Sequence, residues 1–164
     1  MGFVGSYLWR LRQKVGSDLV LMPGAMVVMR DGAGRVLLTR RVDDGTWCLP
    51  AGGAEEGSSF AATAAAELRE ETGAVVASEG LRPFACLSRP ELHTIEYENG
   101  DVTHCFAMCF WAESWSGELR ADEEEVRELG FFALNELPHP LHPPSATGLA
   151  LYGEYMRTGE FQAS

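Results

Sequence analysis

One segment, residues 52–73, limits the possible folds of this chain more than any other. It joins a glycine-rich loop beginning at Gly52 to an alanine-rich stretch that ends at Gly73. The loop glycines permit tight turns and close backbone approach, and Ser58 or Ser59 can cap a following helix. Gly73 suits the left-handed position that closes many helices. The segment therefore predicts a loop that leads directly into a helix.

The last turns of this predicted helix carry three carboxylates. Glu67, Glu70 and Glu71 are spaced i, i+3 and i+4, so their side chains share one helix face. Like charges at this spacing repel by roughly 0.2 to 0.5 kcal/mol, and carboxylates near a helix C-terminus also oppose its dipole. A bound divalent cation would reverse both penalties, and ligands that are all oxygen suit Mg2+ or Mn2+. The alternative interpretation is a solvated acidic helix end.

The same segment resembles the Nudix box, G-x5-E-x7-R-E-U-x-E-E-x-G-U, in which U is aliphatic. Its glycines, one aliphatic residue and three of its glutamates have counterparts here. These counterparts are Gly52, Glu67, Leu68, Glu70, Glu71 and Gly73.

The box departs from the family pattern at three positions. Ser58 stands in place of the first glutamate, Ala66 in place of the arginine, and Ala74 in place of the last aliphatic residue. In the family the arginine and first glutamate are understood to brace the box. Arg69 lies three residues after Ala66 and can reach the same part of a helix. Two interpretations stay open: an active hydrolase, or a catalytically weak or inactive Nudix-fold protein that binds a nucleotide.

The resemblance implies an α/β fold, with a mixed β-sheet in an α/β/α sandwich that spans roughly residues 23–156. It also implies a metal-dependent hydrolase that converts a nucleoside diphosphate derivative, NDP-X, to NMP and P-X. The implied metal ligands are the Gly52 carbonyl and the carboxylates of Glu67, Glu70 and Glu71. Glu67 or Glu125 would accept a proton from water, with Glu124 as the neighbouring candidate.

The resemblance also implies substrate contacts from basic residues before the box, because in many Nudix proteins such residues face the substrate phosphates. Arg40 and Arg41 end the preceding predicted strand, and alternation sends them to opposite faces. At most one is therefore expected to reach the substrate phosphates, and a solvated pair is the alternative.

A further alternative to the hydrolase is an isopentenyl-diphosphate isomerase. Such an enzyme shares the fold and uses a catalytic cysteine outside the box, and Cys86 is the thiol placed for that role.

The composition and charge of the chain limit which binding partners and locations can be expected. The chain has 164 residues, of which 46% are hydrophobic, enough for one core and a single domain over residues 1–164. A net charge of -11 disfavours nucleic acid and anionic membranes as partners, while a nucleotide can arrive with Mg2+. With no signal-peptide pattern, we expect a cytoplasmic monomer or homodimer. The four cysteines form no C-x-x-C pair, so we expect reduced thiols.

Hydrophobic periodicity predicts the remaining elements. Turn residues at 31–34 and 99–101 predict two hairpins. The stretch 102–111 is apolar on both faces, which indicates a strand covered on both sides. The expected helices are 7–15 (within about 6–15) and 145–156, and the expected strands are 25–29, 36–39, 47–49, 81–88, 92–97, 102–112 and 125–133.

Overall fold

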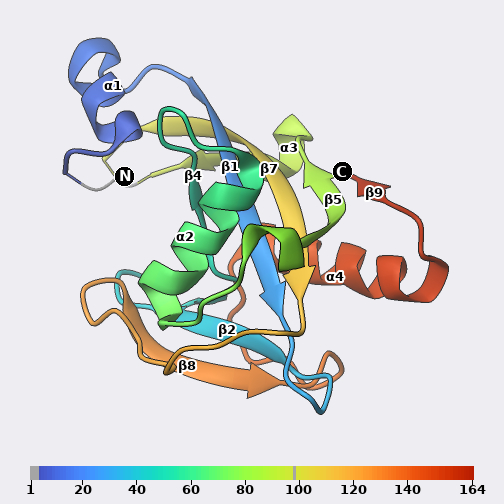
Figure 1. Ribbon diagram of the computed structural model, residues 1–164. Helices are drawn as coiled ribbons and strands as arrows, with labels where there is room; N and C mark the ends of the chain where they lie inside the picture. Colours follow the sequence, from blue (N-terminus) through green and yellow to red (C-terminus); the bar gives the residue numbers. More distant parts are fainter. Residues whose placement is uncertain (1–3, 98) are drawn as a thin grey trace.

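The computed structural model describes residues 4–97 and 99–164, and its helices and strands are shown in Figure 1. In chain order they are α1 (Tyr7–Val15), β1 (Val20–Met29), β2 (Val36–Arg41), β3 (Trp47–Cys48), β4 (Ala51–Gly53), α2 (Phe60–Thr72), the 3-10 turn η1 (Ser78–Gly80), β5 (Arg82–Leu87), α3 (Pro90–His93), β6 (Thr94–Glu96), β7 (Val102–Ala112), β8 (Val126–Phe132), α4 (Pro143–Thr158) and β9 (Gln162–Ala163).

The main sheet is mixed and lies between two helices. Its strand order is β4-β1-β7-β5-β9, with β6 paired to β7. Neighbours β1 and β7 run parallel, whereas β4 is antiparallel to β1 and β5 is antiparallel to β7. Helices α2 and α4 cover opposite faces of this sheet (Figure 1). The expected α/β/α arrangement with a mixed sheet is confirmed.

Alternation along β1 builds the two halves of the core. Val27 and its same-face neighbours pack with Leu68 of α2. Met26 and Val28 point the other way, toward Tyr152 of α4. Strand β7 lies between β1 and β5, and its C-terminal half is buried, as expected for an apolar strand covered on both sides.

The first predicted hairpin is wrong in its pairing. Strand β2 belongs to a second sheet of order β3-β2-β8, and its strand pairing with the β1 side of the turn is limited to one isolated bridge, between Arg30 and Val36. The turn itself forms, because the Asp31 side chain accepts hydrogen bonds from Ala33 N and Arg35 N. Strand β7 pairs along the whole of β1, and on the other edge β4 takes Gly24 to Met26 and Pro50 O accepts from Val27 N, so little of that edge is left to β2.

The predicted strand 92–97 is also corrected. Pro90 begins a short helix, α3, and the strand that follows is only β6. The hairpin between β6 and β7 does form, with Thr94 opposite His104 and Glu96 opposite Val102. Strands β4 and β9, of three and two residues, were not predicted.

Helix α1 matches the prediction at both ends. The Ser6 hydroxyl accepts a hydrogen bond from Trp9 N, and Gly16 closes the helix with a positive φ of 61°. Within residues 4–97 and 99–164 no helix has the length and apolar character needed to cross a membrane. The four cysteines, Cys48, Cys86, Cys105 and Cys109, are free thiols, as expected.

Candidate active site

Helix α2 carries the three glutamates to the edge of the main sheet. Ser59 caps it by accepting a hydrogen bond from Ala62 N, and Gly73 ends it in the left-handed conformation with φ 73°. Because Ala64 and Leu68 are buried against the sheet, the glutamate face of the helix turns toward β4 and β2. The local caps and the apolar stripe together set the direction of the carboxylates.

Glu67 lies directly against the backbone of Gly52. A methyl group on Gly52 would overlap the Glu67 carboxylate, so this position tolerates only glycine without a shift of Glu67. Gly24 of β1 has the same role one strand away, because a Cβ there would lie 2.5 Å from the Gly52 carbonyl oxygen. Gly52, one of the loop glycines predicted to allow close approach, does so between β4 and α2, and Gly24, which was not predicted, does so between β1 and β4.

Glu71 is the most buried of the three glutamates, with 8% of its surface exposed. Its carboxylate accepts hydrogen bonds from Ala51 N at 3.2 Å and Thr39 Oγ1 at 3.3 Å. Burial raises the pKa of Glu71 to about 8; the Ala51 amide opposes this, and the charges of Glu67 and Glu125 add to it. The two donors therefore compensate the buried charge only in part.

Four carboxylates line one cleft of about 290 Å³: Glu67, Glu70, Asp122 and Glu125. Burial, followed by the charge of Glu70, raises the pKa of Glu67 to about 7. Burial, followed by the charge of Asp122, raises the pKa of Glu125. Carboxyl groups with a raised pKa in a cleft are typical of functional sites, because their charged form does not stabilise the fold.

The acidic run 122–125 reaches this cleft through the last turn of α2. Arg120 N donates to Thr72 O at 2.8 Å, and Asp122 N donates to Glu71 O at 3.2 Å. These bonds turn Asp122 and Glu125 inward, whereas Glu124 stays exposed and does not line the cleft. Asp122 was missed from the sequence, where the whole run is typical of a solvated loop.

The donor set fits a hard divalent cation. Every lining residue offers carboxylate oxygens, and the buried Glu71 is close enough for the charges of Glu67 and Glu125 to act on it. Among the described residues, no group of three acidic, histidine or cysteine side chains is close enough to enclose an ion unaided. A cation here would need waters or substrate phosphates as further ligands, which is how Mg2+ is usually held.

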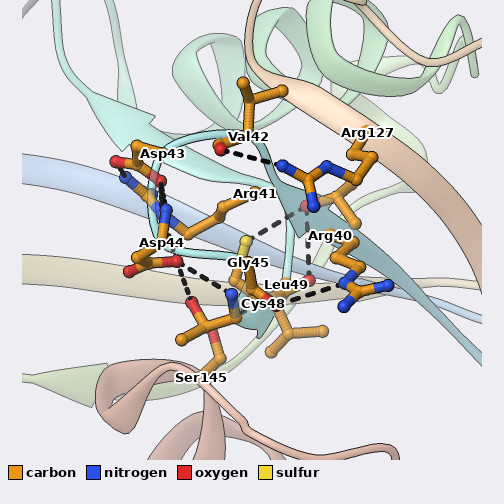
Figure 2. A network of polar contacts seen from close by, with 12 residues as sticks. Arg40, Arg41, Val42, Asp43, Asp44, Gly45, Cys48, Leu49, Arg127 and Ser145 are labelled. Atoms are coloured by element: carbon orange, nitrogen blue, oxygen red, sulfur yellow. Dashed lines mark hydrogen bonds and ion pairs between the residues drawn. The ribbon is translucent and has the colours of Figure 1, made fainter.

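Arg40 and Arg41 point to opposite sides of β2, as alternation predicts (Figure 2). Arg40 pairs with Glu128 at 3.5 Å and donates to the Gly45 carbonyl. Arg41 pairs with Asp43. It lies nearer the carboxylate cleft, because the next residue, Val42, donates from its backbone N to Glu125 O at 2.9 Å. The Arg41 charge opposes the rise in the pKa of Glu125 that burial causes.

Other residues singled out in the sequence lie outside the cleft. Arg69 is exposed and pairs with Glu70 at 3.6 Å, and Ser58 is exposed in the loop before α2. Cys86 is on β5, three strands from β4, or roughly 14 Å at about 4.8 Å per strand. This separation disfavours the isomerase interpretation. Trp47 and Phe84, whose rings are large enough to stack on a nucleotide base, are instead buried in the core.

Comparison with known protein families shows to which family the chain belongs. The model of the NUDIX domain matches residues 20–152. The chain belongs to the Nudix family. The matched range includes the whole of residues 52–73, the segment that resembles the Nudix box with departures at Ser58 and Ala66.

Relatives within the family include an enzyme and solved structures. The NAD-capped RNA hydrolase NudC of Pseudomonas aeruginosa is 31% identical over 116 residues, which is 70% of this chain and 37% of the relative. The chain thus spans little more than a third of the curated relatives it matches. The MutT Nudix hydrolase of Burkholderia pseudomallei superposes with a TM-score of 0.63 at 26% identity, covering 80% of this chain and 98% of that one. A UDP-X diphosphatase gives 0.65 at 20% identity, covering 96% and 73%, and supports the fold alone.

Proposed function

We propose that the protein is a divalent-metal-dependent hydrolase of nucleoside diphosphate derivatives. The reaction adds one water across the diphosphate bond, so that NDP-X becomes NMP and P-X. The observation that carries this proposal is the cleft lined only by the four carboxylates Glu67, Glu70, Asp122 and Glu125. Such a cleft repels a bare nucleotide but accepts one that arrives with Mg2+ or Mn2+.

The metal ligands in this proposal are the Gly52 carbonyl, Glu67, Glu70 and Glu71. A bound metal would polarise the phosphoryl oxygens and lower the pKa of its bound water. Glu71 anchors the group, since Thr39 and Ala51 N hold its carboxylate in one orientation.

The proton acceptor is Glu67 or Glu125. Both carboxylates line the cleft, and both have a raised pKa in the metal-free protein. A bound cation would lower the pKa of its ligand Glu67, whereas Glu125 is not among the proposed ligands and is the better placed of the two to stay a base near neutral pH. Asp122 joins them as a further carboxylate next to Glu125.

The substrate contact in this proposal is Arg41 rather than Arg40. Arg41 is close enough to the cleft for its charge to act on Glu125, whereas Arg40 pairs on the other side with Glu128. Asp43 holds the Arg41 guanidinium in the free protein, so a substrate phosphate would replace a carboxylate partner that is already present. Monomer or homodimer state, cytoplasmic location and one Nudix domain over residues 1–164 stay predictions.

A substrate panel under Mg2+, Mn2+ and excess chelator tests the proposal. The panel contains ADP-ribose, nucleotide sugars, dinucleoside polyphosphates, nucleoside triphosphates and capped RNA, with products separated by chromatography. We expect NMP as a product, activity that rises toward alkaline pH, and none in chelator. Full turnover in chelator would contradict the mechanism, and tight binding without turnover would favour the catalytically weak or inactive nucleotide-binding protein.

A further inference from the structure

Helix α1 contacts the loop that joins β4 to α2. The Glu55 carboxylate of that loop accepts hydrogen bonds from Tyr7 N, at 2.8 Å to one oxygen and 3.1 Å to the other. Tyr7 is the first residue of α1, so Glu55 binds a backbone amide that the helix itself leaves free. A carboxylate at this helix end also meets the positive end of the helix dipole.

Arg10 reinforces the contact one turn further along α1. Its guanidinium lies 3.8 Å from a Glu55 oxygen and 3.4 Å from a Glu56 oxygen. All three side chains are substantially exposed, so each pair by itself is weak. Together with Tyr7 N they attach the loop to the helix at three points.

Helix α1 is itself fixed to the main sheet by a buried arginine. Arg12 donates to Val102 O at 2.6 Å and to Thr103 Oγ1 at 2.9 Å, at the start of β7. It also donates to Asp18 O at 2.6 Å and lies 3.7 Å from Asp101. Figure 1 shows α1 at the end of the sheet where β7 begins. The helix is thus a fixed support rather than a loose N-terminal arm.

The supported loop connects two parts of the active site. On its N-terminal side it continues from β4, where Gly52 touches the Glu67 carboxylate. On its C-terminal side it leads to Ser59, which caps α2. Its other backbone anchors among the described residues are Ala54 N to Pro23 O and the turn bond from Ser58 N to Glu55 O. A displaced loop would therefore shift both Gly52 and the start of the glutamate helix.

We propose that α1 is a positioning element of the active site, which holds the β4–α2 loop through Glu55 and Arg10 so that Glu67 keeps its place against Gly52. In this proposal, α1 holds the loop through residues outside the Nudix box, whereas a charged pair at positions 58 and 66 would hold it through residues within the box. The inference rests on the proposed function only in treating Glu67 as a metal ligand. Arg10, Arg12 and Glu55 are positioning residues, since none of them lines the cleft.

The test compares Arg10→Ala with Lys14→Ala. Both variants remove one positive charge from α1, but the Lys14 side chain forms no hydrogen bond or ion pair with any residue that the structure describes. Charge alone predicts that Mn2+ binds equally well or slightly tighter in both variants, because each becomes more negative. We expect instead that Arg10→Ala binds Mn2+ about two- to five-fold more weakly than Lys14→Ala, the range of an exposed ion-pair network.

Two further readouts separate positioning from general stability. Amide hydrogen exchange of residues 54–58 should become faster in Arg10→Ala and remain unchanged in Lys14→Ala. On a cleaved substrate, Arg10→Ala should lower kcat and leave KM nearly unchanged. Glu55→Gln, which keeps an acceptor for Tyr7 N, should retain more loop protection than Glu55→Ala.

Equal Mn2+ affinity and equal loop exchange in Arg10→Ala and Lys14→Ala would overturn the inference. Neither measurement needs a substrate, so failure to find a cleaved nucleotide would count against the proposed function alone. If the wild-type protein bound no Mn2+, the proposed function would fail, and the exchange of residues 54–58 would still decide whether α1 holds the loop.

Discussion

At the scale of single residues, the three box glutamates have three different environments. Glu71 is buried and hydrogen-bonded, Glu67 is half-buried against Gly52, and Glu70 is exposed. The raised pKa values of Glu71 and Glu67 show that the free protein carries carboxylates it does not fully compensate. Retention of such groups indicates use, because removing their charge would stabilise the fold.

Glu71→Gln tests whether this residue serves function rather than structure. The amide can still accept from Ala51 N, and its own NH2 can donate to Thr39 Oγ1, so both contacts have a replacement. We expect about a 100-fold loss of activity. The melting temperature of the metal-free protein at pH 8 should be equal to or slightly above that of the wild type.

The matching variant Glu70→Gln should behave in the same way, while Glu123→Gln, an exposed residue outside the cleft, should leave activity unchanged. A marked loss of stability in metal-free Glu71→Gln would show that the carboxylate is structural.

The sequence could predict these roles only in part. Helix periodicity correctly places Glu67, Glu70 and Glu71 on adjoining positions of one face. It cannot rank their burial, because that depends on Gly52 and Ala51 of β4, a three-residue strand with almost no sequence signal. The helix direction is a local property, whereas the environment of each carboxylate is made by distant segments.

At the scale of helices and strands, the sequence predicted correctly those helices whose ends are marked by capping residues next to them in the chain. Helix α1 was placed correctly because its amphipathic pattern is closed by Gly16, and α2 because Ser59 and Gly73 mark its limits. The pairing of β2 could not be predicted from its turn, since β4 and β7 compete for the edges of β1. Which strands pair is determined here by contacts between segments far apart in the sequence.

The loop before β8 supplies the site residue that the sequence did not reveal. Asp122 faces the cleft because its backbone N is bonded to Glu71 O, while the adjacent Glu123 is exposed. We expect Asp122→Asn to weaken Mn2+ binding about ten-fold, the lower range for residues that support a metal site. Glu123→Gln changes the overall charge equally and should have little effect. Equal losses in the two variants would mean that only the total negative charge matters.

The box departures provide a test across the loop and α2. Ser58→Glu together with Ala66→Arg should raise turnover several-fold, since the pair can form a charge-assisted brace that fixes Glu67. Arg69 does not supply this brace in the structure, where it pairs with the exposed Glu70. Either change alone adds a charge without its partner, so a double-mutant cycle should show coupling.

The gain should be larger in the Arg10→Ala background, where the support from α1 is weakened. A double variant no faster than the wild type on its best substrate would mean that α1 already holds the loop as well as an internal brace could.

At the scale of the whole molecule, the chain has a net negative charge, and part of that charge is concentrated in the carboxylate cleft. The chain has 24 acidic and 13 basic residues, and four of the carboxylates meet in one cleft. Cations bound at this cleft would therefore stabilise the fold as well as enable catalysis, because ligands that bind only the folded state increase its stability. The pH dependence of stability can reveal the same coupling without any substrate.

We expect the metal-free protein to lose stability as pH rises from 6.5 to 8.5. Glu67 and Glu71 have pKa values of about 7 and about 8 in the folded state, above the ordinary value of 4.5, so the folded state binds more protons than the unfolded chain in this window. Their stabilising contribution is present when they are protonated and is lost as pH rises through the two folded-state values. The loss should be on the order of 2 kcal/mol, or several degrees in melting temperature.

Three comparisons attribute this loss to the cleft. The depressed pKa values of His93 and His142 act mainly below pH 6.5, so they do not produce a fall above it. Glu71→Gln should flatten the slope, because of the two carboxyl groups that titrate in this window it removes the one with the higher pKa. Saturating Mg2+ should reverse the slope, since ionised carboxylates bind the metal and protonated ones do not. An unchanged slope in Glu71→Gln, or no Mg2+ effect at pH 8.5, would show that the cleft does not control the pH response and that its carboxylates do not bind Mg2+ in the folded protein.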